Sequence, residues 1–131
     1  MQAIDEIPPA IDPAALAVFG DDPDKILRLM VTFCRVSPGL LANIRRGIAE
    51  HDAEKTRQAA HAMKSSNGMI GAKTMASLCQ ELEMLARMGQ LDDSEALMAE
   101  LDAEFVRVEC DAATIMTTWQ HQRGARMATF S

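Results

Sequence analysis

The sequence predicts an all-α fold, an antiparallel four-helix bundle with an additional short N-terminal helix. The apolar residues make up 48% of the chain and are mostly Ala, Met, Leu and Ile, with four Phe, one Trp and no Tyr. Ala and unbranched side chains lose little on entering a helix, whereas strands favour β-branched and aromatic residues. Apolar residues also recur every three or four positions, which is the period of an amphipathic helix. Links of a few residues between such segments indicate antiparallel neighbours.

The length of 131 residues predicts one domain over residues 1–131, with its core at about 10–120. A short helix is expected around Pro13 to Phe19. In the stretch DDPDKILRLMVTFCR, Asp22 and Pro23 are a typical N-cap and first helical residue. Ser37 and Pro38 repeat this start signal, so SPGLLANIRRGIAEH is expected to form a separate helix. The apolar stripes of these two segments are Ile26, Leu27, Met30 and Phe33, then Leu40, Leu41, Ile44 and Ile48.

Three further helices are expected in the rest of the chain. Asp52 can cap a helix that runs through His61 to about Ile70, and the next, AKTMASLCQELEMLARMG, ends near Gly89. The last and longest begins with Asp92 or Asp93 as its cap. The apolar seams of these two later helices are Met75, Leu78, Cys79, Leu82 and Leu85, then Ala96, Leu97, Leu101, Phe105, Val108, Ala112, Ile115 and Trp119. Residues 1 to about 10 and 121–131 lack periodicity and are expected to fray.

The composition excludes several classes of function. The net charge of −6 offers no attraction to a polyanion, so nucleic acid is not expected as a partner. Neither a signal peptide nor an apolar run long enough to span a membrane is visible, and we expect a soluble, cytoplasmic protein. Each of the three cysteines, Cys34, Cys79 and Cys110, lies within a periodic apolar pattern, which predicts buried thiols in a reducing compartment.

A helical wheel places His61 opposite the apolar face of its helix. The core face lies roughly 160° to 200° away from His61 around the helix axis and contains Ala59, Met63 and Ile70. Thr56 and Ser66 lie just outside this sector. The residues within about 60° of it are charged, polar or small: Glu54, Arg57, Gln58, Lys64, Ser65 and Gly68. We therefore expect an exposed imidazole beside positive charge and small side chains.

Small residues on this stripe suit the approach of a partner. Ser65 and Gly68 follow His61 by one and two turns, although Gly in an exposed helix costs about 1 kcal/mol relative to Ala. A strip without bulky side chains lets a partner's backbone come close to the imidazole. Lys64 and Arg57 flank the ring, where they would meet a phosphoryl group or an acidic partner surface. The alternative interpretation of Ser65 and Gly68 is casual surface variation, and that of Lys64 and Arg57 is a solvated charged face.

Two other kinds of site are disfavoured. A metal site would need further ligands at the correct spacing, and only Glu54 is available on this face, two turns away and beside cations. A hydrolase of the Ser-His type is disfavoured because nothing in the sequence orients the ring, although Ser65 follows it at i+4. No metal is therefore expected.

The stretch AHAMKSSNGMIGA resembles the signature of histidine-containing phosphotransfer (HPt) domains. In that signature the active His is followed by Lys at the third position, a small residue at the fourth, and Gly-Ala at the tenth and eleventh. Here these are His61, Lys64, Ser65, and Gly71 with Ala72. The resemblance covers roughly residues 10 to 115. It departs at Asn67, where Ser is common, and at Met69, where many members carry a small polar residue, which bears on partner preference.

The resemblance implies a monomeric bundle that relays a phosphoryl group between its histidine and aspartates of response-regulator receiver domains, including one of a hybrid sensor kinase. It implies His61 as phosphoacceptor and donor and Lys64 as the residue that neutralises phosphoryl charge. The residues expected to contact the receiver are Arg57, Ser65, Gly68 and Met69, while Gly71 and Ala72 would end one helix and let the next pack closely. No cofactor is implied for this chain, since the receiver would hold the Mg²⁺.

Two rivals place a histidine on a helical bundle. The phosphoacceptor domain of a sensor kinase usually has an acidic residue directly after the His and a Pro soon after it, whereas Ala62 and Met63 follow here. The other rival is a non-catalytic binding or anti-regulator module whose histidine is incidental. No nucleotide-binding domain accompanies the bundle, so we expect a phosphotransfer intermediate without kinase activity of its own. The initial Met and the complete bundle favour a free-standing protein.

Overall fold

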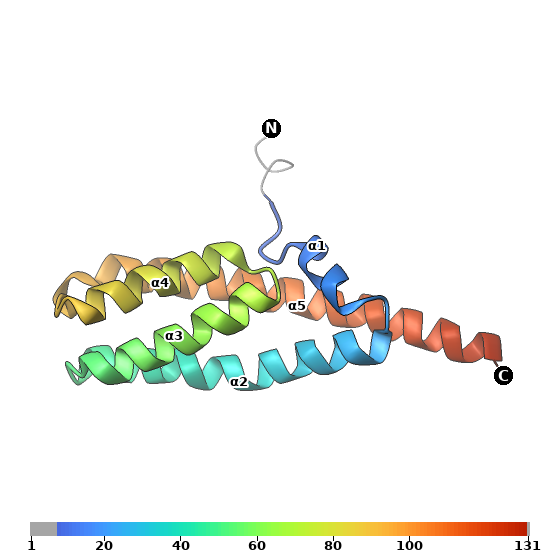
Figure 1. Ribbon diagram of the computed structural model, residues 1–131, viewed down its shortest axis with the longest axis horizontal. Helices are drawn as coiled ribbons and strands as arrows, with labels where there is room; N and C mark the ends of the chain where they lie inside the picture. Colours follow the sequence, from blue (N-terminus) through green and yellow to red (C-terminus); the bar gives the residue numbers. More distant parts are fainter. Residues whose placement is uncertain (1–7, 131) are drawn as a thin grey trace.

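Four long helices form the body of the molecule, as the computed structural model shows for residues 8–130 (Figure 1). They are α2 (Pro23–Ala49), α3 (Ala53–Met69), α4 (Lys73–Arg87) and α5 (Glu95–Phe130). A short α1 (Pro13–Leu16) and a 3₁₀ turn, η1 (Ala17–Phe19), precede them, and a second turn, η2 (Leu91–Asp93), leads into α5. No strand occurs in this part of the chain, which confirms the all-α prediction.

The helices pack as a closed ring in which α2 contacts α3 and α5, and α4 also contacts α3 and α5. The side chains that fill the ring are the apolar stripes of all four helices, including Met30, Ile44, Met63 and Leu101, each with 0% exposure. Asp22 and Asp52 cap α2 and α3 as predicted, because their carboxylates accept hydrogen bonds from the amides of Asp24 and Lys55. None of the described helices is long and apolar enough to cross a membrane.

The predicted helix start at Ser37 and Pro38 is wrong, because Pro38 lies inside a continuous α2. Proline inside a helix removes one backbone hydrogen bond and typically costs about 3 kcal/mol. Here the Pro38 ring is exposed, while Phe33, Ser37 and Leu41 on either side continue one buried stripe. Packing of that unbroken stripe outweighs the local start signal. The two segments that were predicted as separate helices therefore form one, and the described part of the chain has four long helices.

The last helix also differs from its prediction at both ends. Asp92 and Asp93 belong to η2 and do not cap α5, which begins at Glu95. Residues 121–130 continue α5 as a helix instead of fraying. Arg123 explains part of this, since its Nε lies 3.1 Å from Oδ1 of Asp24 at the start of α2. The far end of α5 thus passes the start of α2 and projects beyond it, and it also lies beyond the ends of α3 and α4 (Figure 1).

The segment before α1 is fixed to the bundle by side chains of α5. Ile11, only 1% exposed, donates its backbone N–H to Oδ2 of Asp111 at 3.0 Å. Arg107 donates to the carbonyl of Pro8 at 2.6 Å. The expected fraying of residues 1 to about 10 is therefore wrong for residues 8–10, and residues 1–7 lie outside the described part of the chain.

The turn between α3 and α4 fits against this same segment. Gly71 adopts a φ of +84°, which favours glycine, and its carbonyl accepts a hydrogen bond from the amide of Asp12 at 3.0 Å. A Cβ at Gly71 would lie 2.5 Å from Cβ of Ala15. The next residue, Ala72, is fully buried at the start of α4. The close approach at Gly71 is therefore to α1 and to Asp12, which caps it.

The three cysteines do not share one environment. Cys79 is buried, and burial raises the pKa of its thiol to about 12. Cys34 is half-buried and Cys110 is exposed, so the prediction of three buried thiols is wrong for Cys110. Its neighbours Val108 and Ala112 take the buried positions of α5, which leaves Cys110 on the opposite face.

Candidate functional site

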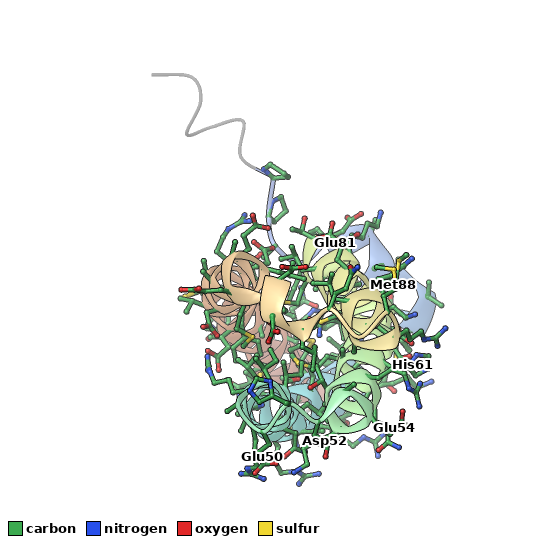
Figure 2. The ribbon with its side chains drawn as sticks, turned by 90° about the vertical axis from the view of Figure 1, so that its left-hand side faces the viewer. Glu50, Asp52, Glu54, His61, Glu81 and Met88 are labelled. Carbon is green, nitrogen blue, oxygen red and sulfur yellow. The ribbon has the colours of Figure 1, made fainter. Side chains whose placement is uncertain are left out.

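His61 lies in the middle of α3 with its side chain 54% exposed, as the helical wheel predicts. Figure 2 shows it on the outer side of the bundle, on the same side as Met88, which follows the last residue of α4. On the opposite side of α3, Ala59 and Met63 are buried in the core. The imidazole is thus carried by a rigid, well-packed helix and remains open to solvent.

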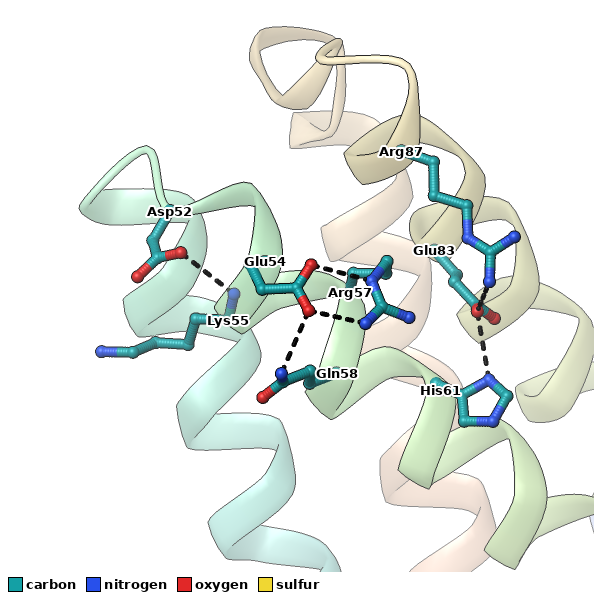
Figure 3. Close-up of polar contacts among 8 residues, drawn as sticks. All are labelled: Asp52, Glu54, Lys55, Arg57, Gln58, His61, Glu83 and Arg87. Atoms are coloured by element: carbon teal, nitrogen blue, oxygen red, sulfur yellow. Dashed lines mark hydrogen bonds and ion pairs between the residues drawn. The ribbon is translucent and has the colours of Figure 1, made fainter.

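A buried glutamate of α4 contacts the ring. Oε2 of Glu83 lies 3.1 Å from Nδ1 of His61 and 3.0 Å from Nη2 of Arg87, and Oε1 lies 2.9 Å from Nζ of Lys64 (Figure 3 shows the first two contacts). The Glu83 side chain is only 4% exposed. The expectation that nothing orients the imidazole is therefore wrong: one carboxylate holds the histidine and two cations together.

Sequence reasoning missed Glu83 because 22 residues separate it from His61. A signal was nevertheless present in α4. Glu83 follows the buried Cys79 by four positions and precedes the buried Ala86 by three, so it occupies a position on the core-facing side of the helix. A glutamate is rarely buried unless it is paired, and this position should have pointed to partners on a neighbouring helix.

The surroundings of Glu83 determine its protonation state. Burial raises the pKa of its carboxyl, but the hydrogen bonds and positive charges of Lys64 and His61 oppose this and leave the pKa below its ordinary value. Glu83 is therefore ionised at neutral pH. Because an ionised carboxylate only accepts hydrogen bonds, Nδ1 of His61 must carry the hydrogen that it shares with Glu83. In the neutral ring this leaves the lone pair on Nε2.

The other predicted charges near His61 are already paired. Arg57 donates two hydrogen bonds to Glu54, at 3.0 and 2.6 Å, and Gln58 donates to the same carboxylate (Figure 3). These hydrogen bonds lower the pKa of Glu54 to about 2, and those from Arg57 have the largest effect. Arg57 therefore stands beside the site as half of an ion pair. Lys64 is also paired, but with Glu83 and next to the ring.

The strip beyond His61 on α3 is open. Ser65 is exposed, and a Cβ at Gly68 would meet no atom within 4 Å. Met69 is 55% exposed and lines an apolar hollow of about 170 Å³ between α3 and α2. Val36 of α2, itself 48% exposed, forms part of the opposite wall. The structure thus places an apolar depression beside the small residues that follow the histidine.

No group of three or more His, Cys, Asp or Glu side chains capable of holding a metal ion occurs within residues 8–130. The negative charge of Glu83 is already shared among His61, Lys64 and Arg87. The chemistry that this arrangement offers is therefore that of one oriented, exposed imidazole with cations next to it.

Removing the Glu83 carboxylate should slow any reaction in which Nε2 of His61 is the nucleophile. For Glu83→Ala we expect a fall in the maximal rate of roughly tenfold or more, because the ring loses its hydrogen-bonded orientation. Glu83→Gln keeps an acceptor oxygen for Nδ1–H but loses the negative charge, so it should recover only part of the rate. Single-turnover kinetics at saturating partner concentration measure this, and equal rates for the Ala and Gln variants would contradict a positioning role.

Comparison with known proteins identifies relatives of this chain. The family model described as "Hpt domain" matches residues 28–109. Among solved structures, the chain is similar to histidine-containing phosphotransfer protein B (HptB) from Pseudomonas aeruginosa PAO1, with 27% sequence identity and a TM-score of 0.71. That match covers 91% of this chain and 98% of the other. No match was found among curated protein sequences.

Proposed function

This chain belongs to the family of Hpt domains and is a histidine phosphotransfer protein of phosphorelay signalling, and we propose that His61 is the residue that carries the phosphoryl group. The observation that supports this assignment is the contact between Nδ1 of His61 and the buried carboxylate of Glu83 at 3.1 Å. It leaves Nε2 free on an exposed ring, which is the form of the imidazole that a phosphoryl acceptor needs.

In the proposed transfer, Nε2 of His61 attacks the phosphorus of an aspartyl phosphate on a receiver domain. The N–P bond forms as the bond between phosphorus and the aspartate oxygen breaks, and the aspartate leaves as a carboxylate. No proton has to leave the ring, because Nδ1 keeps its hydrogen. The ring becomes cationic as it bonds to phosphorus, and the ionised Glu83 lies 3.1 Å from it to stabilise that charge. The reverse reaction returns the phosphoryl group to a receiver.

Lys64 suits the role of a cation beside the phosphoryl group. Its side chain is 31% exposed and its Nζ lies 2.9 Å from Oε1 of Glu83, on the same carboxylate that holds His61. A phosphoryl group on Nε2 would bring further negative charge to the ring, and Lys64 and Arg87 are the cations that share the Glu83 carboxylate with that ring. The Mg²⁺ that assists phosphoryl transfer would be held by the receiver.

Hpt domains interact with receiver domains, and we infer that the receiver docks along α3 beyond the histidine. Ser65 and Gly68 allow its backbone to approach, and Met69 with Val36 offers apolar contact at the hollow beside them. Arg57, paired with Glu54, would lie at the edge of this surface. We further propose that the chain acts in the cytoplasm as a monomer, with a receiver of a hybrid sensor kinase among its partners.

The test is transfer from a receiver domain that carries a radiolabelled aspartyl phosphate. The wild-type chain should take up label that is labile in acid and stable in alkali, as expected of phosphohistidine. Peptide mapping should locate the label in the segment that contains His61. A chain that acquires no label from any receiver of its source organism would instead be the non-catalytic binding module.

A bulky side chain at Gly68 should weaken receiver docking without harming the fold. Gly68→Gln enters open space on a helix, where Gln is favoured over Gly, so thermal stability should not fall. We expect the KM for the phosphorylated receiver to rise about tenfold, corresponding to about 1.4 kcal/mol of lost docking energy. Gly124→Gln is the matched control, because Gly124 is also an open helical glycine but lies at the far end of α5. Equal KM values for the two variants would exclude Gly68 from the docking surface.

A further inference from the structure

A groove with an excess of positive charge lies away from His61, between the N-terminal half of α2 and the far end of α5. Its volume is about 590 Å³. Leu27 and Val31 of α2 supply apolar lining, Arg28 and Arg35 stand along α2, and Arg123 stands on α5. Gln120 and Arg123 form the α5 wall of this groove, and Arg123 belongs to the segment that was predicted to fray.

The arginines of the groove differ in whether they form an ion pair. Arg123 is paired with Asp24, whose Oδ1 lies 3.1 Å from its Nε. Within residues 8–130, no acidic side chain forms an ion pair with Arg28 or Arg35, and both are exposed. On a chain whose net charge is −6, these two guanidinium groups form a local surplus of positive charge. The groove thus presents unpaired donors for anionic groups.

The spacing of these arginines indicates the shape of a suitable ligand. Arg28 and Arg35 are seven residues apart on one helix, so they share a face and lie about 10.5 Å apart along its axis. Val31 lies between them and is 48% exposed. Donors spread in this way do not converge on one small anion. They match two anionic groups separated by a similar length, with an apolar group between them.

We propose that this groove binds an extended acidic segment of a partner protein, with carboxylates on Arg28 and Arg35 and an apolar side chain over Val31. In a polyproline-II conformation, residues three apart lie on one side of the chain about 9 Å from each other, close to the spacing of the arginines. An acidic peptide of this pattern therefore meets both guanidinium groups at once. Arg–carboxylate pairs can also be bidentate, which adds geometric selectivity.

The groove is separate from the imidazole and its ion-pair partners, since His61, Lys64 and Glu83 do not line it, and it adjoins the hollow beside Met69, with which it shares Thr32. A partner held there would leave the imidazole accessible. Binding of the acidic segment would raise the local concentration of any domain linked to that segment. The apparent affinity of that domain for this chain would then increase without a new contact at the histidine. The inference stands whether or not His61 accepts a phosphoryl group.

Fluorescence polarisation on the full chain tests this, with a short fluorescein-labelled peptide that has two Glu residues three positions apart and a Leu between them. Wild type should bind it, and Arg28→Glu and Arg35→Glu should each weaken binding by about tenfold or more. Arg46→Glu is the matched control: it is an exposed arginine of α2 outside the groove, with only a 3.5 Å contact to Asn43. It should bind as wild type does, and so should His61→Gln.

Two results would overturn the proposal. One is equal binding by the Arg35→Glu and Arg46→Glu proteins, which would show that the peptide follows overall charge and not the groove. The other is equally tight binding of the same peptide with both Glu residues replaced by Gln, which would show that the carboxylates do not contribute to binding. Circular dichroism of each variant verifies that the helices are intact.

Discussion

The His61→Gln protein is expected to accept no phosphoryl label from a phosphorylated receiver, while the wild-type chain is labelled. The Gln amide nitrogen is not a nucleophile, and no other imidazole contacts Glu83 in the described part of the chain. Because His61 is exposed and makes its ion pair only with Glu83, the substitution should leave the bundle folded. Time courses of label transfer, with circular dichroism as the check on folding, measure this effect.

The chain supplies two matched controls for this experiment. His51 lies after the end of α2, with its Nδ1 3.8 Å from Asp92 and its side chain 77% exposed, and His121 lies on the exposed surface of α5. His51→Gln and His121→Gln should both be labelled at the wild-type rate. Loss of labelling in either control, or its retention in His61→Gln, would place the phosphoryl group on a different residue.

Gly47→Val should destabilise the fold by about 3 kcal/mol, near the upper end of what overpacking usually costs. At Gly47, α2 and α3 approach closely: a Cβ there would lie 2.3 Å from Oγ1 and 2.9 Å from the backbone N of Thr56. The space cannot open easily, because the Thr56 hydroxyl donates to the carbonyl of Asp52 and the Asp52 amide donates to the carbonyl of Gly47. Urea denaturation should show a lower midpoint for this variant.

Gly39→Val is the control for that substitution. Gly39 lies in the same helix, but a Cβ there would meet no atom within 4 Å. Its stability should change by no more than about 0.5 kcal/mol, as for most exposed substitutions. If both variants lost equal stability, the cause would be a general effect of Val in α2 and not the approach of α3.

Local patterns in the sequence were enough to predict the helical class and the orientation of His61. Both depend on periodicity within one segment, and the caps Asp22 and Asp52 depend on neighbours two or three residues away. The features that were missed depend on contacts across the fold. Pro38 is a plausible helix start until the buried stripe on both sides of it is packed, and α5 continues past residue 120 with the help of Asp24, far away in the chain.

The same reason explains the missing part of the site. Lys64 is a neighbour of His61 along α3, so a helical wheel finds it. Glu83 is brought to the ring only by the packing of α4 against α3, and nothing in the order of residues pairs those two side chains. Its place among the buried residues of α4 was the available signal. The groove on α2 was hidden in a similar way, since Arg123 belongs to a segment predicted to fray.

The most direct measurement is to identify the phosphorylated nitrogen by NMR. The chain would be labelled with ¹⁵N-histidine, phosphorylated by a receiver, and analysed through long-range ¹H–¹⁵N correlations and coupling to ³¹P. Because Glu83 holds Nδ1–H of His61 at 3.1 Å, the phosphoryl group should be bonded to Nε2 of that ring. A phosphoryl group on Nδ1 of His61, or on another side chain, would contradict the account.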